Sequence, residues 1–168
     1  MANKTVEMLT SAGSITIELD EVHAPLSTTN FLAYVKAGHY DGTVFHRVIK
    51  GFMLQGGGFE PGMKQRATQA AIKNEANNGL KNKRYTLAMA RTGDPHSATA
   101  QFFINTTDNA FLDFTAENAS GWGYAVFARV TAGTDVVDAI ERMRTGRKGF
   151  HDDVPLEDVR IERATVVG

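Results

Sequence analysis

The segment Phe45–Gly57 contains polar side chains in a setting that is unusual for a core strand. Arg47 and Gln55 lie in a stretch otherwise dominated by large apolar groups. If the two side chains converge, a strong, fixed hydrogen-bond donor lies beside an amide, over an apolar floor made by Phe52 and Met53. A lone arginine in such a stretch would more simply be a surface residue on an edge strand, so the rest of the chain must decide.

Other kinds of active site find little support in the sequence. The absence of cysteine excludes thiol catalysis and disulfides. The five histidines have neither an i,i+4 partner nor an H-E-x-x-H setting, so we expect no metal site. Gly56, Gly57 and Gly58 are followed by Pro61 where a dinucleotide-binding fingerprint needs glycine. We interpret them as places of flexible backbone or of close approach by another chain. Ser120 lacks the flanking glycine of a nucleophile elbow.

Short strands account for most of the elements that we predict. These segments alternate apolar and polar residues or are rich in β-branched and aromatic side chains, as half-buried strands are. They are Val6–Leu9, Ile15–Leu19, Thr43–Ile49, Phe52–Gln55, Tyr85–Met89, Phe102–Asn105, Tyr124–Val130 and Val159–Val167. Ser11, Ala12 and Gly13 supply turn chemistry between the first two, which predicts a hairpin.

Two segments follow a helical period instead. The first begins at Pro25, which suits the first turn of a helix, and ends at Gly38. The second runs from Thr134 to Met143, with Thr134 as the expected N-cap and Asp135 in the first turn, where the helix dipole favours a carboxylate. The expected core stripes are Phe31, Leu32 and Val35 in the first helix and Val136, Val137, Ile140 and Met143 in the second.

The predicted fold is mainly β. Eight strands and two isolated helices argue against repeated β-α-β units, whereas a closed eight-stranded antiparallel barrel capped by two α-helices would hide the sheet edges. The length of 168 residues fits a single domain that spans 1–168. The segment Glu60–Arg84 fits neither period and is long for a connection, and the sequence leaves open whether it packs along a binding groove.

Charge and hydropathy exclude several classes of protein. With 18 Lys+Arg, 19 Asp+Glu and a net charge of -1, the chain lacks the basic surplus of a nucleic-acid-binding protein. We interpret Lys81–Arg84, its densest charge cluster, as a solvated loop. No apolar run approaches the ~20 residues of a membrane-spanning helix. The first residues lack the apolar stretch of a signal peptide, so we expect a cytoplasmic protein.

The segment Phe45–Gly57 resembles the signature of the cyclophilins, the cyclosporin-binding peptidyl-prolyl isomerases. The similarity continues through Thr86–Arg91, Ser97–Ile104, Phe111–Asp113 and Tyr124–Phe127. It covers essentially the whole chain and is greatest to the bacterial single-domain branch of the family. The resemblance implies an eight-stranded antiparallel barrel with two capping helices, which the strand pattern predicts independently, and catalysis of cis/trans isomerisation at X-Pro bonds.

The resemblance also implies roles for particular residues. Arg47 is the expected catalytic donor, which would favour the twisted amide over the planar ground state. Because the rotation breaks no covalent bond, it needs no nucleophile, metal or cofactor. The expected substrate-binding residues are Phe52, Met53, Phe103 and Leu112 around the proline ring, Gln55 and Gln101 at the substrate backbone, Ala90 and Arg91 beside the groove, and Phe111 and Tyr124 at its wall.

Three positions depart from the family pattern. Arg91 stands where many eukaryotic members carry asparagine; if that position acts mainly through its backbone, function is kept. Tyr124 replaces a common histidine and keeps an aromatic wall with a polar tip. Phe111 replaces the tryptophan of cyclosporin-sensitive members, which predicts that cyclosporin is a weak inhibitor. None of the three departures removes the Arg47 donor.

We predict an enzyme that accelerates rotation of X-Pro bonds in unfolded or flexible protein segments and so assists folding. The alternative is a module or holdase that binds proline-containing polypeptides on the same barrel, with incidental turnover. Loss of the arginine would favour that alternative, but Arg47 is present. The one sequence feature that supports association with RNA is the Lys81–Arg84 cluster. We therefore expect a monomer whose partners are proline-containing polypeptides, not nucleic acid or membrane.

Overall fold

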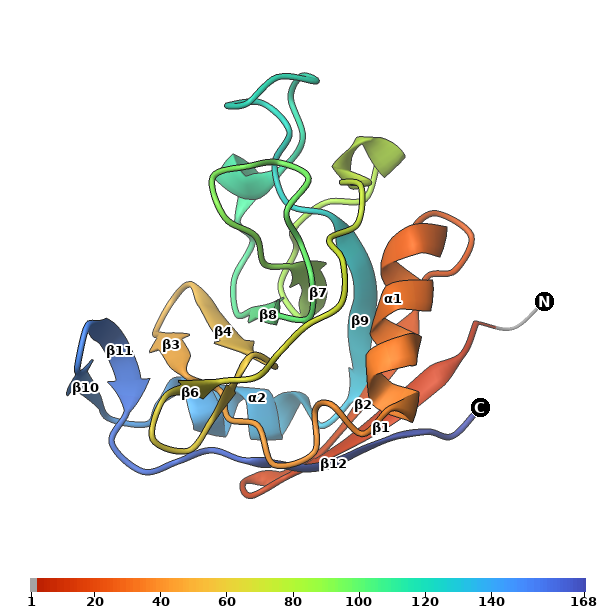
Figure 1. The fold of residues 1–168 in the computed structure, drawn as a ribbon. Helices are drawn as coiled ribbons and strands as arrows, with labels where there is room; N and C mark the ends of the chain where they lie inside the picture. The colour runs from red at the N-terminus through yellow and green to blue at the C-terminus, as the bar shows by residue number, and fades with distance from the viewer. Residues whose placement is uncertain (1–2) are drawn as a thin grey trace.

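The computed structural model describes residues 3–168. Eight strands form one antiparallel sheet in the order β12-β1-β2-β9-β7-β8-β4-β3 (Figure 1). Their bounds are β1 Thr5–Thr10, β2 Gly13–Leu19, β3 Arg47–Ile49, β4 Met53–Gly56, β7 Thr86–Met89, β8 Phe102–Asn105, β9 Val126–Ala132 and β12 Ile161–Val166. The prediction of a mainly β fold on an eight-stranded antiparallel sheet is confirmed.

The sheet is curled but not closed by a continuous ladder, so the predicted closed barrel overstates the closure. The end strands β12 and β3 do not pair with each other. Residues 42–45, before β3, instead bond to residues 159–161 around the start of β12. Ile161 accepts from the Gly42 amide and donates to the Thr43 carbonyl, both at 2.7 Å, Val44 forms an isolated bridge with Arg160, and the Phe45 amide donates to the Val159 carbonyl at 2.9 Å. Only β3, the last part of the predicted strand Thr43–Ile49, therefore joins the ladder.

Helix α1 (Pro25–Lys36) packs against β9 and β12. It begins at Pro25 as predicted, and Gly38, with φ +73°, follows its last turn. The backbone N–H groups of Leu26 and Ser27 donate to the Glu75 carboxylate at 3.0 and 2.6 Å, so a distant loop satisfies the free donors of the helix N-terminus. The predicted core residues of this helix are buried: Phe31, Leu32 and Val35.

Helix α2 (Thr134–Glu141) ends before the predicted Met143. Its N-cap is Gly133, with φ +89°, and no side chain caps the helix, so the prediction of Thr134 as the cap is wrong. A Cβ atom at Gly133 would collide with the Ser14 carbonyl oxygen, which explains why this left-handed position is glycine. Within the predicted stripe, Val137 and Ile140 are buried, Val136 is half-buried, and Met143 is exposed.

Two short hairpins lie beside the main sheet, and the sequence pattern predicts neither. β5 (Phe59–Glu60) pairs with β6 (Lys64–Gln65), and β10 (Thr145–Lys148) pairs with β11 (His151–Pro155). Their residues are largely polar or charged, so the alternation of a half-buried strand is missing. The long segment between β6 and β7 adds one 3-10 turn, η1 (Ala76–Asn78). Among residues 3–168, no helix combines the length and apolar character needed to cross a membrane.

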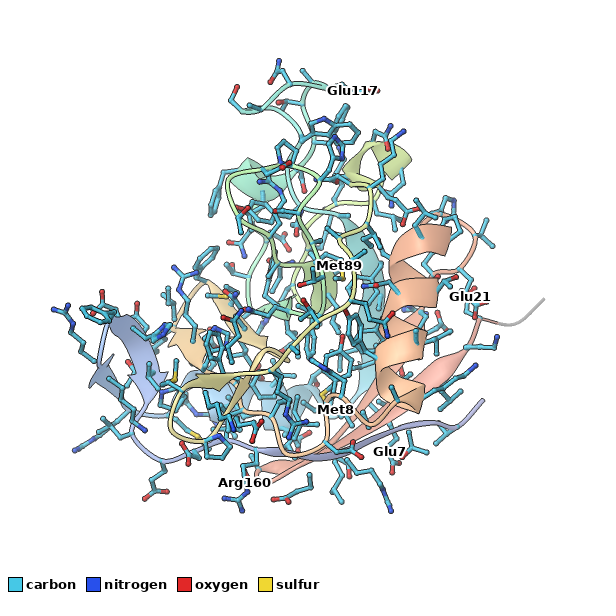
Figure 2. The ribbon with its side chains drawn as sticks, viewed as in Figure 1. Glu7, Met8, Glu21, Met89, Glu117 and Arg160 are labelled. Carbon is cyan, nitrogen blue, oxygen red and sulfur yellow. The ribbon has the colours of Figure 1, made fainter. Side chains whose placement is uncertain are left out.

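Successive residues of a strand point to opposite faces of the sheet. Apolar side chains are buried on the inner face and, in part of the sheet, also on the outer face. Figure 2 labels two neighbours that show this alternation in β1, the exposed Glu7 and the buried Met8. The inner face carries the main hydrophobic cluster, to which Leu54, Phe102 and Ile104 belong. A second, smaller cluster contains Met53, Ala88, Ala90, Phe103, Leu112 and Val126. The alternation in β4, β7 and β8 thus provides an apolar surface on the outer face, outside the main core.

Candidate active site

A row of side chains crosses the outer face of the sheet. In the antiparallel register, Arg47 of β3 is opposite Gln55 of β4, Gln55 is opposite Phe103 of β8, and Phe103 is opposite Ala88 of β7. Directly opposite residues share a face, so the whole row lies on the outer side. Met53 is two residues from Gln55 along β4 and shares that face. The fold thus brings Arg47 and Gln55 together over an apolar floor.

These side chains surround a pocket of about 170 Å³. Its lining residues are Arg47, Phe52, Met53, Gln55, Ala90, Arg91, Phe103, Leu112 and Tyr124. Of the site residues expected from the sequence, Gln101 and Phe111 lie outside this lining. Gln101 lines an adjoining pocket that shares Gln55, Ala90 and Arg91 with the first. Phe111 lies in the 3-10 turn η2 (Ala110–Leu112), where it is 75% exposed and its ring centroid is 5.7 Å from that of Phe52.

The polar groups of the pocket form a short series of side chains. Arg47 Nη1 lies 3.5 Å from Gln55 Oε1, and Gln55 Nε2 donates to Gln101 Oε1 at 2.9 Å. Arg47 is exposed, and no carboxylate among residues 3–168 forms an ion pair with it. Its positive charge is therefore available to a ligand in the pocket, with the floor of Met53 and Phe103 beside it.

Arg91 is held in the wall between the two pockets. Its Nε donates to the Gly123 carbonyl at 3.0 Å, and its Nη1 donates to the Thr92 carbonyl at 2.8 Å. The guanidinium carbon lies 4.4 Å from the centroid of the Tyr124 ring, within cation–π range. The side chain at position 91 therefore fixes the loop that carries Tyr124, a role that asparagine is too short to copy.

The three consecutive glycines after Gln55 allow other segments of the protein to approach the backbone closely. A Cβ atom at Gly58 would lie 2.5 Å from the Gln101 side chain, and one at Gly57 would lie 2.8 Å from the Tyr40 ring. Gly58 therefore leaves the space that Gln101 occupies beside the pocket. Of the two interpretations that the sequence offers for these glycines, the structure favours close approach over a flexible backbone.

His46 immediately precedes β3 and is buried, whereas its neighbour Arg47 is exposed. Burial, with smaller contributions from the nearby His151 and Arg47, lowers the pKa of His46 to about 4. Its Nδ1 has no hydrogen-bond partner among the described residues, in agreement with a neutral ring. Within residues 3–168, no three His, Asp or Glu side chains are grouped so that they could hold a metal ion.

Comparison with known proteins identifies the family. Residues 5–166 match the family model of the cyclophilin-type peptidyl-prolyl cis-trans isomerases. The chain belongs to this family. It is 62% identical over 164 residues to a peptidyl-prolyl cis-trans isomerase of Streptomyces antibioticus, an alignment that covers 98% of this chain and 99% of that one. It is 63% identical over 157 residues to peptidyl-prolyl cis-trans isomerase B of Escherichia coli, covering 94% of this chain and 96% of that one.

Solved structures agree with this assignment. A crystal structure of a cyclophilin-type isomerase of Cryptosporidium parvum, determined in the presence of the dipeptide Ala-Pro, superposes with a TM-score of 0.83 at 25% sequence identity. The superposition covers 98% of this chain and 99% of that chain. The protein is thus a bacterial-type cyclophilin and a peptidyl-prolyl cis-trans isomerase, as its sequence predicts.

The activity of this cyclophilin should be nearly independent of pH between about 6 and 8, the range in which an ordinary histidine titrates. The pocket lining contains arginine, glutamine, tyrosine and apolar groups but no histidine, and the low pKa of His46 keeps that buried ring neutral throughout. A profile of kcat/KM against pH on an X-Pro peptide measures this. A bell-shaped profile in that range would indicate general acid–base catalysis instead.

Stability should depend on pH through His46. The pKa of this group is about 4 in the folded protein and 6.5 in the unfolded chain, so between these values the unfolded state binds more protons and stability rises with pH. Acidification from pH 7 to 5 should cost about 2 kcal/mol through this group alone. In urea unfolding, His46→Phe should lose correspondingly less stability over that range. An equal loss in both proteins would contradict the assignment.

The sequence gives no signal for several residues that shape the pocket. Asn82 is distant in sequence from Asn105 and Asn109, and all three are buried beside the pocket. Their spacing matches no motif, and each alone is an ordinary turn or strand residue. Only the fold shows that they meet.

Proposed function

We propose that Arg47 is the group that lowers the barrier to X-Pro rotation. Rotation faces a barrier of about 18–20 kcal/mol because the amide must lose its resonance. In the twisted state the imide nitrogen becomes pyramidal and regains its lone pair. A guanidinium beside that nitrogen binds the twisted state better than the planar one, and this difference accelerates the rotation. The charge is already in place before the reaction, so no reorganisation is needed.

The apolar part of the pocket is proposed to hold the proline ring while the preceding carbonyl swings. Met53 and Phe103 are almost completely buried and offer a floor, with Leu112 and Phe52 at its sides. Met53 is unbranched and can adapt to the ring as it turns. A relative of known structure was crystallised in the presence of Ala-Pro, which supports a proline-containing peptide as the ligand here.

The amides of Gln55 and Gln101 are proposed to hydrogen-bond the substrate backbone on either side of the rotating bond. They are joined by one hydrogen bond of 2.9 Å and line the pocket next to that of Arg47. Each side-chain amide has further donors and acceptors to offer. Ala90 and Arg91 line both pockets and would align the peptide. Tyr124 would form the wall of the proline pocket, and Phe111, beside Phe52, would form its rim.

One observation carries this proposal: Arg47, which forms no ion pair with a carboxylate among residues 3–168, stands over the apolar floor of a pocket on the outer face of the sheet. The test is a protease-coupled assay on a short X-Pro peptide, in which the protease cleaves only the trans isomer. The wild-type protein should accelerate the slow phase, and alteration of Arg47 should remove most of that acceleration. Acceleration that is independent of Arg47 would refute its role.

We further propose that residues 1–168 act as one domain, as a monomer in the cytoplasm, on proline-containing segments of unfolded or flexible proteins. The family model that spans residues 5–166 supports the single domain. Light scattering after gel filtration tests the oligomeric state, and a mass of twice 18.3 kDa would contradict a monomer. Cell fractionation tests the compartment.

A further inference from the structure

Three buried asparagines lie next to the pocket without lining it. Asn82, Asn105 and Asn109 are 2%, 0% and 3% exposed, respectively. A buried side-chain amide is costly unless its donors and acceptors are paired. Asn105 points to the outer face of β8, on the same side as Phe103, because the two are separated by one residue. Asn105 therefore lies on the same side of the sheet as the pocket floor.

The side chains of these asparagines are bonded in series. Asn109 Nδ2 donates to Asn105 Oδ1 at 2.8 Å, and Asn105 Nδ2 donates to Asn82 Oδ1 at 3.1 Å. The series is supported at its sides: Asn105 Nδ2 also donates to Thr86 Oγ1 at 3.0 Å, and Asn82 Nδ2 donates to Asp113 Oδ1 at 3.1 Å. Each of the three side-chain amides is thus paired, and the bond from Asn105 to Asn82 joins positions 23 residues apart.

The ends of the series are backbone groups of pocket residues. Asn109 Nδ2 donates to the Phe52 carbonyl at 2.9 Å, and the Leu112 amide donates to the Asn109 carbonyl at 3.0 Å. Asn82 Nδ2 lies 3.3 Å from the Tyr124 carbonyl, and the Tyr124 amide donates to the Leu112 carbonyl at 2.9 Å. Phe52, Leu112 and Tyr124 come from three separate parts of the chain, and each is tied to this network.

We propose that Asn82, Asn105 and Asn109 form a positioning network that fixes the distance between Phe52, Leu112 and Tyr124 and thereby sets the width of the proline pocket. The inference rests on the proposed function of that pocket. The asparagines do not touch the substrate; they act through the backbone of the residues that do. Small displacements of such residues have large effects, since a shift of about 1 Å can cost about 10² in rate.

The test uses Asn109→Ala, which removes the link to Phe52 but leaves the bond between Asn82 and Asn105. The expected result is a dissociation constant for an Ala-Pro peptide, measured by NMR titration, and a KM that both rise on the order of tenfold. A variant that is merely destabilised would lose active protein, which lowers the apparent kcat and leaves KM unchanged. Asn77→Ala, at the exposed middle position of η1, is the matched control and should behave as wild type.

Unchanged peptide affinity and KM in folded Asn109→Ala would overturn the network. If this variant does not fold, the unaltered protein supplies the readout. The side-chain amide protons of Asn105 and Asn109 should resist hydrogen exchange and become more protected when the pocket is saturated with peptide. Protection that peptide does not change would equally overturn the proposal. Failure of the wild-type protein to bind the peptide would instead refute the proposed function itself, so the two failures are distinguishable.

Discussion

Arg47→Ala should lower kcat/KM for X-Pro isomerisation by about 10²–10³ while the protein stays folded. Loss of one preorganised donor typically costs about 2.7–4 kcal/mol of transition-state stabilisation. The fold should tolerate the change because Arg47 is exposed at the start of β3, and its one side-chain hydrogen bond within the described part of the chain is the 3.5 Å contact with Gln55. Peptide affinity should change much less than kcat, because the apolar floor is intact. The protease-coupled assay measures the loss of kcat/KM, and circular dichroism shows whether the variant is folded.

Two further variants make the Arg47 experiment specific. Arg163→Ala removes an exposed arginine from β12, at the opposite end of the sheet order from β3, and should retain wild-type activity. Arg47→Lys keeps the charge but not the planar fork of donors, and should recover only a small part of the loss. Near-normal kcat/KM in folded Arg47→Ala would rule out the proposed mechanism.

Phe111→Trp should tighten cyclosporin binding about 10–100-fold. The indole adds an N–H donor and a larger apolar surface at the rim of the pocket. A hydrogen bond is worth about 0.5–1.5 kcal/mol net, and more where the acceptor would otherwise be buried without a partner. Phe111 is 75% exposed beside Phe52, so the larger ring has room. Titration of both proteins with cyclosporin measures the difference.

Peptide turnover should change far less than inhibitor binding in this variant. Phe52 and Leu112 still enclose the proline ring, so kcat/KM for Phe111→Trp should stay within a few-fold of wild type. Phe150→Trp is the matched control: Phe150 is also strongly exposed, but in the β10–β11 turn and outside the pocket lining. Equal cyclosporin affinities for Phe111→Trp and the wild-type protein would show that position 111 does not contact the inhibitor.

The sequence predicts the elements of the main sheet because most of its strands alternate apolar and polar residues or are strongly apolar. The strand pattern leaves open whether Arg47 and Gln55 converge, and their roles come from the family resemblance. The structure brings them together, since they pair across the β3–β4 hairpin. Strand ends were less predictable. The predicted strand Thr43–Ile49 begins with β-branched and aromatic residues, yet these form only isolated bridges and hydrogen bonds to other parts of the chain and are not part of β3.

Features that depend on distant contacts could not be predicted. The Thr134 cap is wrong because the carbonyl of Ser14 lies where a Cβ atom at position 133 would be, so glycine takes the cap position. The β10–β11 hairpin is too polar to show a strand period. The bond from Arg91 to the Gly123 carbonyl likewise joins segments whose proximity no local pattern encodes.

The most direct test of the account is NMR exchange spectroscopy on a short X-Pro peptide, with the protein far below the peptide concentration. Uncatalysed, the cis and trans signals interconvert over tens to hundreds of seconds. We expect the wild-type protein to bring exchange into the NMR time range without altering the ratio of cis to trans, because a catalyst does not shift an equilibrium. Arg47→Ala should bind the peptide, as judged by chemical shifts, but leave exchange slow. Unaccelerated exchange with the wild-type protein, or a cis/trans ratio that shifts only near stoichiometric protein, would contradict catalysis and indicate a binding module.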